Sequence, residues 1–178
     1  MTRPDRLGLA LVATRRRRRT DSPIDDLTDP TTLCAWLQAR GLEVGECSPG
    51  DLTAICELRE AIYDSVAAAA TDGHPTPSAL DILNAVASHP MTERKLLWDT
   101  NSGFHLETGP HTLTQALITI ARDTVDLLTG PVRDQLRQCE ADSCGTVFIA
   151  PASGRPRRWC SSATCGNRER VRAHRAGS

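Results

Sequence analysis

The stretch that decides the fold of this chain reads RRWCSSATCGNR and spans residues 157–168. It contains a pair of cysteines in the spacing C-x4-C, Cys160 and Cys165. A second pair with the same spacing, Cys139 and Cys144, stands before it with fifteen residues between the pairs. Two such pairs supply the four soft ligands that tetrahedral Zn²⁺ prefers, and their short loops cost little entropy to close. The sequence therefore predicts one structural zinc ion, with no open coordination position for catalysis.

The residues around these cysteines predict a treble-clef-like zinc finger. A knuckle at the first pair leads into a strand at 146–149 and a turn, and the second pair then opens a helix from 162 to about 174. A helix start suits two thiolates, because the helix dipole and free amides stabilise negative charge there. We expect Phe148 and Trp159 to form a small core over the metal. So small a core cannot stabilise the module alone, and the metal would supply most of its stability.

Charge is distributed unevenly along the 178 residues, although the net charge is only −1. Residues 151–178 hold seven Arg and one acidic residue, a net charge of +6. Residues 1–150 hold fourteen basic and twenty-one acidic residues, a net charge of −7. A basic tail that includes a metal-pinned helix is typical of nucleic-acid-binding proteins.

The rest of the chain predicts a mostly helical domain with a small sheet. Prolines after capping residues indicate three helix starts, and a further helix is expected from about 112 to 129. Residues 94–108 predict a hairpin, and the apolar residues 7–12 predict a short buried strand. We therefore expect a mainly α protein with a small β component. It divides into a helical domain at 1–135 and a zinc finger at 136–178. The three helix starts are Asp29-Pro30, Ser48-Pro49 and Thr76-Pro77.

Two features of the helical domain permit alternatives. Residues 15–19 are five consecutive arginines, which form either a solvated turn or an arm that touches phosphates. Cys34 and Cys56 flank apolar helix positions and are expected to be small core residues. Cys47 precedes a helix start and is a candidate for an exposed, reactive thiol.

The module resembles the CGNR zinc finger, a family named for the tetrapeptide that stands here at 165–168. The similarity covers residues 139–175, except that Ala150-Pro151-Ala152-Ser153 lacks an acid common near this turn. Members usually carry an N-terminal ABATE domain and are described as stress-linked transcriptional regulators or RNA-binding proteins of bacteria. The first 135 residues are similar to ABATE in style, at Thr14-Arg15 and at 37–42. The resemblance implies an ABATE-like domain followed by the four-cysteine zinc finger.

Six residues of the module are candidates for contact with nucleic acid. Arg168, Arg172 and Arg175 share one face of the predicted helix, over about 10 Å. Guanidinium groups bind phosphates in bidentate fashion and also pair with guanine edges. The alternative is an ordinary solvated helix. The six candidates are Arg157, Arg158, Asn167, Arg168, Arg172 and Arg175.

Local structural roles compete with nucleic-acid contact for the other three candidates. Arg157 and Arg158 precede a metal ligand, so either could fix the hairpin to the helix. Asn167 more readily caps a turn than reads a base.

No catalytic site can be assembled from the sequence. The run His105-Leu106-Glu107 has the H-x-E half of a zinc deaminase motif, but the P-C-x-x-C half is absent. The common nucleotide-binding, hydrolase and metalloprotease motifs are absent as well. We therefore expect a binding protein and not an enzyme.

The prediction that combines these features is a transcriptional regulator that binds DNA. RNA binding by the same surface and a zinc-stapled protein-interaction module are the alternatives. The helical domain would sense a small-molecule ligand or form a homodimer. No apolar run approaches the roughly 20 residues of a membrane helix, and residues 7–12 are too few for a signal peptide. We expect a cytoplasmic protein with no membrane partner, whose paired cysteines bind metal.

Overall fold

The structure is a computed structural model that describes residues 6–42, 44–91, 94–108, 112–152, 154 and 157–176. Within these residues it is mainly helical, with three separate two-stranded antiparallel sheets. A cluster of four cysteines lies in the C-terminal region. The predicted fold class, mainly α with a small β component and a zinc finger, is therefore confirmed. No helix in the described part of the chain is long and apolar enough to cross a bilayer.

Four helices of the first domain begin where the sequence predicts them. In each, the N-cap side chain accepts a hydrogen bond from the backbone N–H three residues later. These bonds satisfy amides that a helix start otherwise leaves free, and proline at the first position of three of the helices has a suitable φ. The helices and their N-caps are α2 (Pro30–Gln38, Asp29), α3 (Pro49–Ala70, Ser48), α4 (Pro77–Ser88, Thr76) and α5 (Leu113–Thr129, Thr112).

The start of the chain contradicts a prediction, because residues 7–12 form the helix α1 (Leu7–Val12) and not a strand. Six apolar residues fit either structure, and only packing decides between them. α1 packs against α3 and α5. The approach is close at Gly8, where a Cβ would lie 2.2 Å from Thr124 Oγ1. Asp123 on α5 accepts hydrogen bonds from the Gly8 N–H and the Arg6 guanidinium, which fixes the start of α1.

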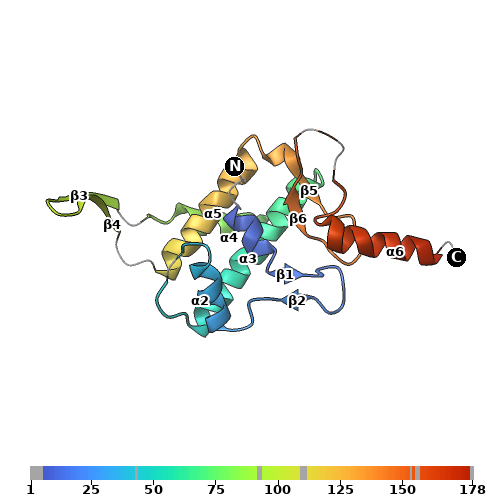
Figure 1. Cartoon of the computed structure of the whole chain (residues 1–178), viewed down its shortest axis with the longest axis horizontal. Helices are drawn as coiled ribbons and strands as arrows, with labels where there is room; N and C mark the ends of the chain where they lie inside the picture. The colour runs from blue at the N-terminus through green and yellow to red at the C-terminus, as the bar shows by residue number, and fades with distance from the viewer. Residues whose placement is uncertain are drawn as a thin grey trace.

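α3 lies at the centre of the helical domain, between α1, α4 and α5 (Figure 1). One face of its middle is buried against these helices. The largest buried apolar side chains of α3 are Ile55, Leu58, Ile62 and Val66.

The first strands of the zinc module also pack on α3. The 3-10 turn η1 (Arg133–Gln135) leads into β5 (Leu136–Gln138), which pairs with β6 (Val147–Ile149). Leu136 and Val147 are buried in the same hydrophobic cluster as the apolar residues of α3. One core therefore extends from the helical domain into the zinc module.

The predicted hairpin is present as β3 (Arg94–Asp99) and β4 (Gly103–Thr108). It projects from the helical body (Figure 1). Trp98 pairs with Phe104 across the two strands, with ring centroids 4.7 Å apart. Both rings are exposed, so they add nothing to the core.

The five-arginine run is largely engaged within the fold. β1 (Arg15–Arg16) pairs with β2 (Ile24–Asp25). Ion pairs then hold the run to the helical domain, from Arg16 to Asp26 and from Arg18 to Glu60, each at 2.6 Å. The run is therefore mainly a structural element and not a free solvated turn. Its ion pairs leave fewer charges for contact with phosphates, and that contact stays a prediction.

Cys34 and Cys47 form a disulfide, with their Cα atoms 6.0 Å apart. This corrects the prediction of a core thiol at Cys34, and it removes Cys47 as a candidate for a free, reactive thiol. The bond joins α2 to the segment that precedes α3, because the chain turns back between the two helices. Cys56 on α3 remains a free, half-buried thiol.

Candidate metal centre and nucleic-acid interface

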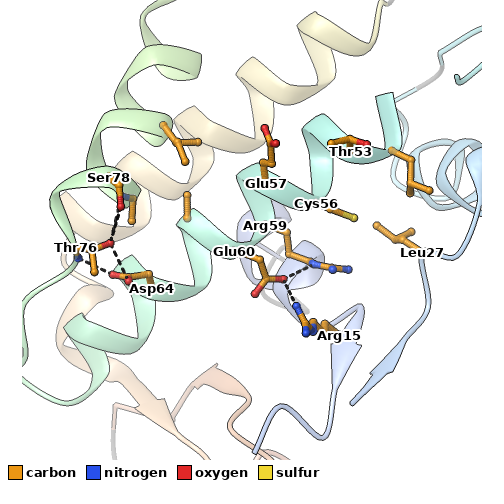
Figure 2. A pocket seen from close by; sticks show the side chains of 14 residues that line it. Arg15, Leu27, Thr53, Cys56, Glu57, Arg59, Glu60, Asp64, Thr76 and Ser78 are labelled. Atoms are coloured by element: carbon orange, nitrogen blue, oxygen red, sulfur yellow. Dashed lines mark hydrogen bonds and ion pairs between the residues drawn. The ribbon is translucent and has the colours of Figure 1, made fainter. Parts of the chain in front are cut away.

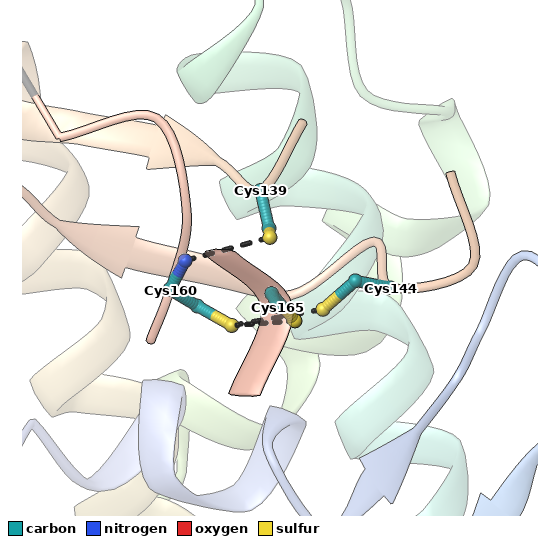
Figure 3. A group of neighbouring side chains, drawn as sticks. All are labelled: Cys139, Cys144, Cys160 and Cys165. Carbon is teal, nitrogen blue, oxygen red and sulfur yellow. Dashed lines mark hydrogen bonds between the residues drawn. The ribbon is translucent and has the colours of Figure 1, made fainter. Parts of the chain in front are cut away.

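Four thiols from two separate segments meet in one cluster (Figure 3). Their Sγ atoms all lie within 4.8 Å of one another. Sγ of Cys160 lies 3.7 Å from Sγ of Cys144 and 3.7 Å from Sγ of Cys165. The fold thus brings together all four predicted metal ligands, Cys139, Cys144, Cys160 and Cys165.

The geometry and chemistry of this cluster fit one zinc ion. A zinc–sulfur distance of about 2.3 Å places neighbouring sulfurs of a regular tetrahedron about 3.8 Å apart. Among the described residues the cluster consists of cysteines alone, and three of the four are buried. Four thiolates favour zinc over cations that prefer oxygen ligands. The site is therefore a closed one for a structural Zn²⁺.

The neighbouring thiols perturb one another. The hydrogen bond with Cys160 lowers the pKa of Cys144, and the same contact raises the pKa of Cys160. Burial raises the pKa of Cys165 to about 11. A divalent cation allows all four sulfurs to be deprotonated together, so metal binding releases protons and weakens as the pH falls.

Backbone hydrogen bonds shape the first knuckle, which we define as residues 139–144. The Cys139 N–H donates to the Thr146 carbonyl at 2.8 Å, which continues the pairing of β5 with β6. The Cys144 N–H donates to the Ala141 carbonyl at 2.9 Å and closes a tight turn. Both sulfurs are thereby directed to the same side of the loop (Figure 3).

The second pair is positioned by a helix start, as predicted. The Cys160 N–H points to Cys139 Sγ at 3.4 Å. Ser161 Oγ then accepts from the Thr164 N–H at 3.2 Å and caps the π-helical turn η2 (Ser162–Gly166). The helix α6 (Asn167–Ala176) continues directly from this turn. The metal cluster therefore holds α6 at its N-terminal end.

Two aromatic residues pack beside the cysteines. Phe148 is buried and Trp159 is half-buried in the same cluster. Gly166 allows this packing, because a Cβ there would lie 3.2 Å from Trp159 Cε3. The predicted small core over the metal is confirmed, and these rings are occupied in packing and not displayed for base stacking.

All six predicted nucleic-acid contacts are exposed, but two of them already have acidic partners. Arg158 Nε lies 2.5 Å from Glu140 of the first knuckle. Arg172 pairs with Asp142 of the same knuckle. These contacts give both arginines a structural role, since they fix the second half of the module against the first.

The other four candidates have no acidic partner among the described residues. Arg168 donates to Ser143 Oγ at 2.8 Å, and Arg157 lies over the Phe148 ring at 4.5 Å. Arg175 lies on the same face of α6 as Arg168, and Asn167 is the first residue of that helix. Their charges and polar groups are therefore available to a ligand.

Sequence reasoning missed Arg170, which also lacks an acidic partner in the described region. Its guanidinium donates to the Ser162 carbonyl at 3.2 Å, on the side of α6 away from Arg168. The sequence does contain a signal for Arg170, because it stands on the arginine-rich helix. It lies outside the helical face that Arg168, Arg172 and Arg175 share, and the prediction was restricted to that face.

Sequence reasoning also missed a contact that we call the arginine clasp, made by Arg18 and Arg19. The Arg18 N–H donates to the Cys144 carbonyl at 3.1 Å. The Arg19 guanidinium donates to the Cys139 carbonyl at 3.4 Å and to Gln138 Oε1 at 2.5 Å. The clasp ties the start of the helical domain to the first knuckle.

Two family models match the chain. One is ABATE, described as "Putative stress-induced transcription regulator", and it matches residues 5–131. The other is the CGNR zinc finger, which matches residues 135–177 and so includes the four cysteines and α6. No curated protein matches the chain. The chain belongs to the ABATE family and carries a CGNR zinc finger after its ABATE domain.

Proposed function

We propose that this protein is a transcriptional regulator that binds DNA through its zinc module, with α6 as the docking helix. One observation carries the proposal. α6 extends from the body with its arginines exposed, and the metal cluster holds its N-terminal end (Figure 1). A rigidly held basic helix can enter the major groove and neutralise phosphates beside it. The family description as a stress-induced transcription regulator supports the same role.

The individual arginines should contribute unequally to this binding. Arg168 and Arg175 have no acidic partner among the described residues, so they can bind phosphate without breaking an ion pair. Arg172 would first have to leave Asp142 and Glu169. We therefore expect the first two to dominate affinity. In this proposal the protein is a cytoplasmic binding protein and not an enzyme.

The test is the affinity for duplex fragments of the host genome, measured by fluorescence anisotropy at several salt concentrations. The double variant Arg168→Ala with Arg175→Ala should weaken binding by about tenfold or more and reduce the salt slope by about two. The control removes the same charge from exposed positions of the helical domain, with Arg17→Ala and Arg133→Ala, and should bind as the wild type does.

A variant of opposite sign sharpens this test. Asp142→Asn removes a carboxylate from the proposed surface and frees Arg172 from one of its two acidic partners, while Glu169 stays at 3.4 Å. Binding should therefore tighten several-fold and depend more steeply on salt. Asp81→Asn, an exposed position on α4, changes the charge equally and should have little effect. Unchanged affinity in the Arg168→Ala, Arg175→Ala double variant at fixed salt would rule out α6 as the docking helix.

Competition between duplex DNA and RNA distinguishes the nearest alternative. Single-stranded RNA is read mainly by aromatic stacking, and Phe148 and Trp159 are packed beside the metal cluster. We expect duplex DNA to compete more strongly than structured or single-stranded RNA. The reverse order would make the protein an RNA-binding one, and salt-insensitive binding to a protein partner would favour the interaction module.

A further inference from the structure

A cleft of about 650 Å³ opens beside the middle of α3, and none of the arginines of the proposed DNA-binding surface lines it (Figure 2). Its walls come from α3, from the first turns of α4 and from the segment that contains β1 and β2. This size is typical of sites for small organic molecules. A cleft of this kind in the helical domain has no role in holding the metal or α6.

Most of the cleft wall is apolar. Cys56 contributes to it as a neutral group, because burial raises the pKa of its thiol. Two small side chains, Ala61 on α3 and Ala79 on α4, line the cleft where these helices meet. The apolar lining consists of Leu27, Leu52, Cys56, Ala61, Ala79 and Ile82. A ligand that fills the cleft must therefore have an apolar body.

One end of the cleft carries an excess of positive charge (Figure 2). Glu60 is shared by three arginines, with N···O distances of 3.4 Å to Arg15, 2.6 Å to Arg18 and 2.9 Å to Arg59. Of these three arginines, Arg59 is the one that binds Asp25, at 2.6 Å. Three guanidinium groups thus face two carboxylates, which leaves one positive charge uncompensated in the cluster.

Arg15 is the member of this cluster best placed to receive a ligand. It lines the cleft, its side chain is 38% exposed, and its contact with Glu60 is the longest of the three. The Arg59 side chain, in contrast, is only 2% exposed and is held by both Asp25 and Glu60. Arg15 can therefore turn its donors to an incoming anion while Arg59 stays in place.

The acidic groups elsewhere around the cleft do not create an equivalent site for a cation. Asp64 accepts hydrogen bonds from the backbone N–H and the hydroxyl of Thr76, at the start of α4, and is satisfied there. Glu57 is exposed and points away from Arg15 and Arg59 (Figure 2). Both carboxylates keep their negative charge, so the positive part of the cleft is confined to the end that Arg15 and Arg59 line.

We propose that this cleft binds a small amphipathic carboxylate, with its carboxylate at Arg15 and its apolar chain along the wall between α3 and α4. One bound anion balances the charge of the cluster, and the chain covers the apolar lining. The inference goes beyond DNA binding by the zinc module and does not depend on it. It gives the helical domain a defined ligand class.

The experiment measures binding to the full-length, zinc-loaded protein in the absence of nucleic acid, by isothermal titration calorimetry. The probes are octanoate, octan-1-ol and octylamine, which share one apolar chain and differ in the charge of the head group. Octanoate should bind saturably, and the alcohol and the amine should bind about tenfold more weakly or worse, because they lack a charge-assisted hydrogen bond to Arg15. Equal or tighter binding of octylamine would overturn the proposal.

Two variants tie the binding to this cleft. Arg15→Gln should weaken octanoate binding about tenfold or more and reduce the difference between octanoate and octan-1-ol. Arg17→Gln removes the same charge two residues away, on an exposed side chain outside the cleft, and should leave affinity within about twofold. Circular dichroism of both variants checks that the helices are intact. No saturable octanoate binding, or equal binding by Arg15→Gln, would refute the site, whatever the outcome for DNA.

Discussion

At the scale of single residues, the most consequential charge is one that the fold buries. The Arg59 side chain is 2% exposed in the middle of α3 and binds both oxygens of Asp25 at 2.6 Å. Partial burial, the largest single influence, would raise the pKa of Asp25. The hydrogen bonds from Arg59 and the Leu27 N–H, together with the charges of Arg59 and Arg15, outweigh it and hold this pKa below its ordinary value. The pair fixes β2 to α3 and also supports the charged end of the cleft.

Replacing Asp25 by Asn tests this pair. We expect Asp25→Asn to lower the free energy of unfolding by about 1–2 kcal/mol near neutral pH, at the lower end because a third of the Asp25 side chain is exposed. Since the folded pKa is depressed, the carboxylate stabilises the fold above its unfolded pKa of about 3.9 and this stabilisation is lost as the pH falls through the folded value. The difference from wild type should therefore shrink in acid.

Urea unfolding followed by circular dichroism, at neutral and at acidic pH, measures both effects. The matched control is Asp26→Asn, the next residue, whose ion pair with Arg16 is exposed on both sides and should matter little. Equal losses in the two variants would show that Arg59 does not need this carboxylate.

At the scale of elements, α6 depends on the metal more than any other helix does. None of its residues is buried, and at ten residues it is too short to be stable alone in water. Its support comes from η2, from the second cysteine pair and from the contacts of Arg168 and Arg172 with the first knuckle. α3, in contrast, lies in the main core.

Removal of zinc should therefore release α6 while it leaves α3 folded. We expect chelation to abolish amide-exchange protection in peptides from 160–176 and to preserve it in peptides from 55–66. Cys165→Ser should reproduce the effect without a chelator. Cys56→Ser, which alters a free thiol away from the cluster, should not. Protection of α6 that persists in metal-free protein would mean that the helix has another source of stability.

The elements also show which parts of the fold follow from sequence alone. α2, α3 and α4 were predictable because capping residues and prolines act within one turn of the helix start. α1 was not, because six apolar residues carry no periodicity and its packing partner Thr124 is more than a hundred residues away. The disulfide of Cys34 with Cys47 depends in the same way on how the chain turns back.

The candidate site also has parts that follow from the local sequence and parts that depend on the fold. The four metal ligands were predictable because thiolate spacing reflects coordination geometry directly. The partners of the arginines were not, since Glu140 and Asp142 lie in the other half of the module from Arg158 and Arg172. A charge count registers arginines and acids separately, whereas the fold pairs some of them and leaves others available.

At the scale of the whole molecule, the zinc module and the helical domain share structure. Leu136 and Val147 of the module lie in the main core. The arginine clasp runs in the opposite direction, from Arg18 and Arg19 to the carbonyls of the first knuckle. The boundary between the two family matches, at 131–135, therefore does not mark the edge of a core.

This shared core predicts that damage to the module reaches the helical domain. Leu136 is 1% exposed, so Leu136→Ala should leave a cavity beside α3 and lower the free energy of unfolding by about 2–4 kcal/mol. Amide exchange of α3 should accelerate together with that of β5, because both pack on the same side chain. Val171→Ala truncates a side chain that is 43% exposed on α6 and should leave both unchanged. If Leu136→Ala instead accelerated exchange in β5 and the knuckles while α3 kept its full protection, the two parts would unfold independently. The shared core would then contribute nothing to the stability of α3. Loss of exchange protection in α3 and β5 together would mean that the zinc module and the helical domain respond to perturbation as one unit.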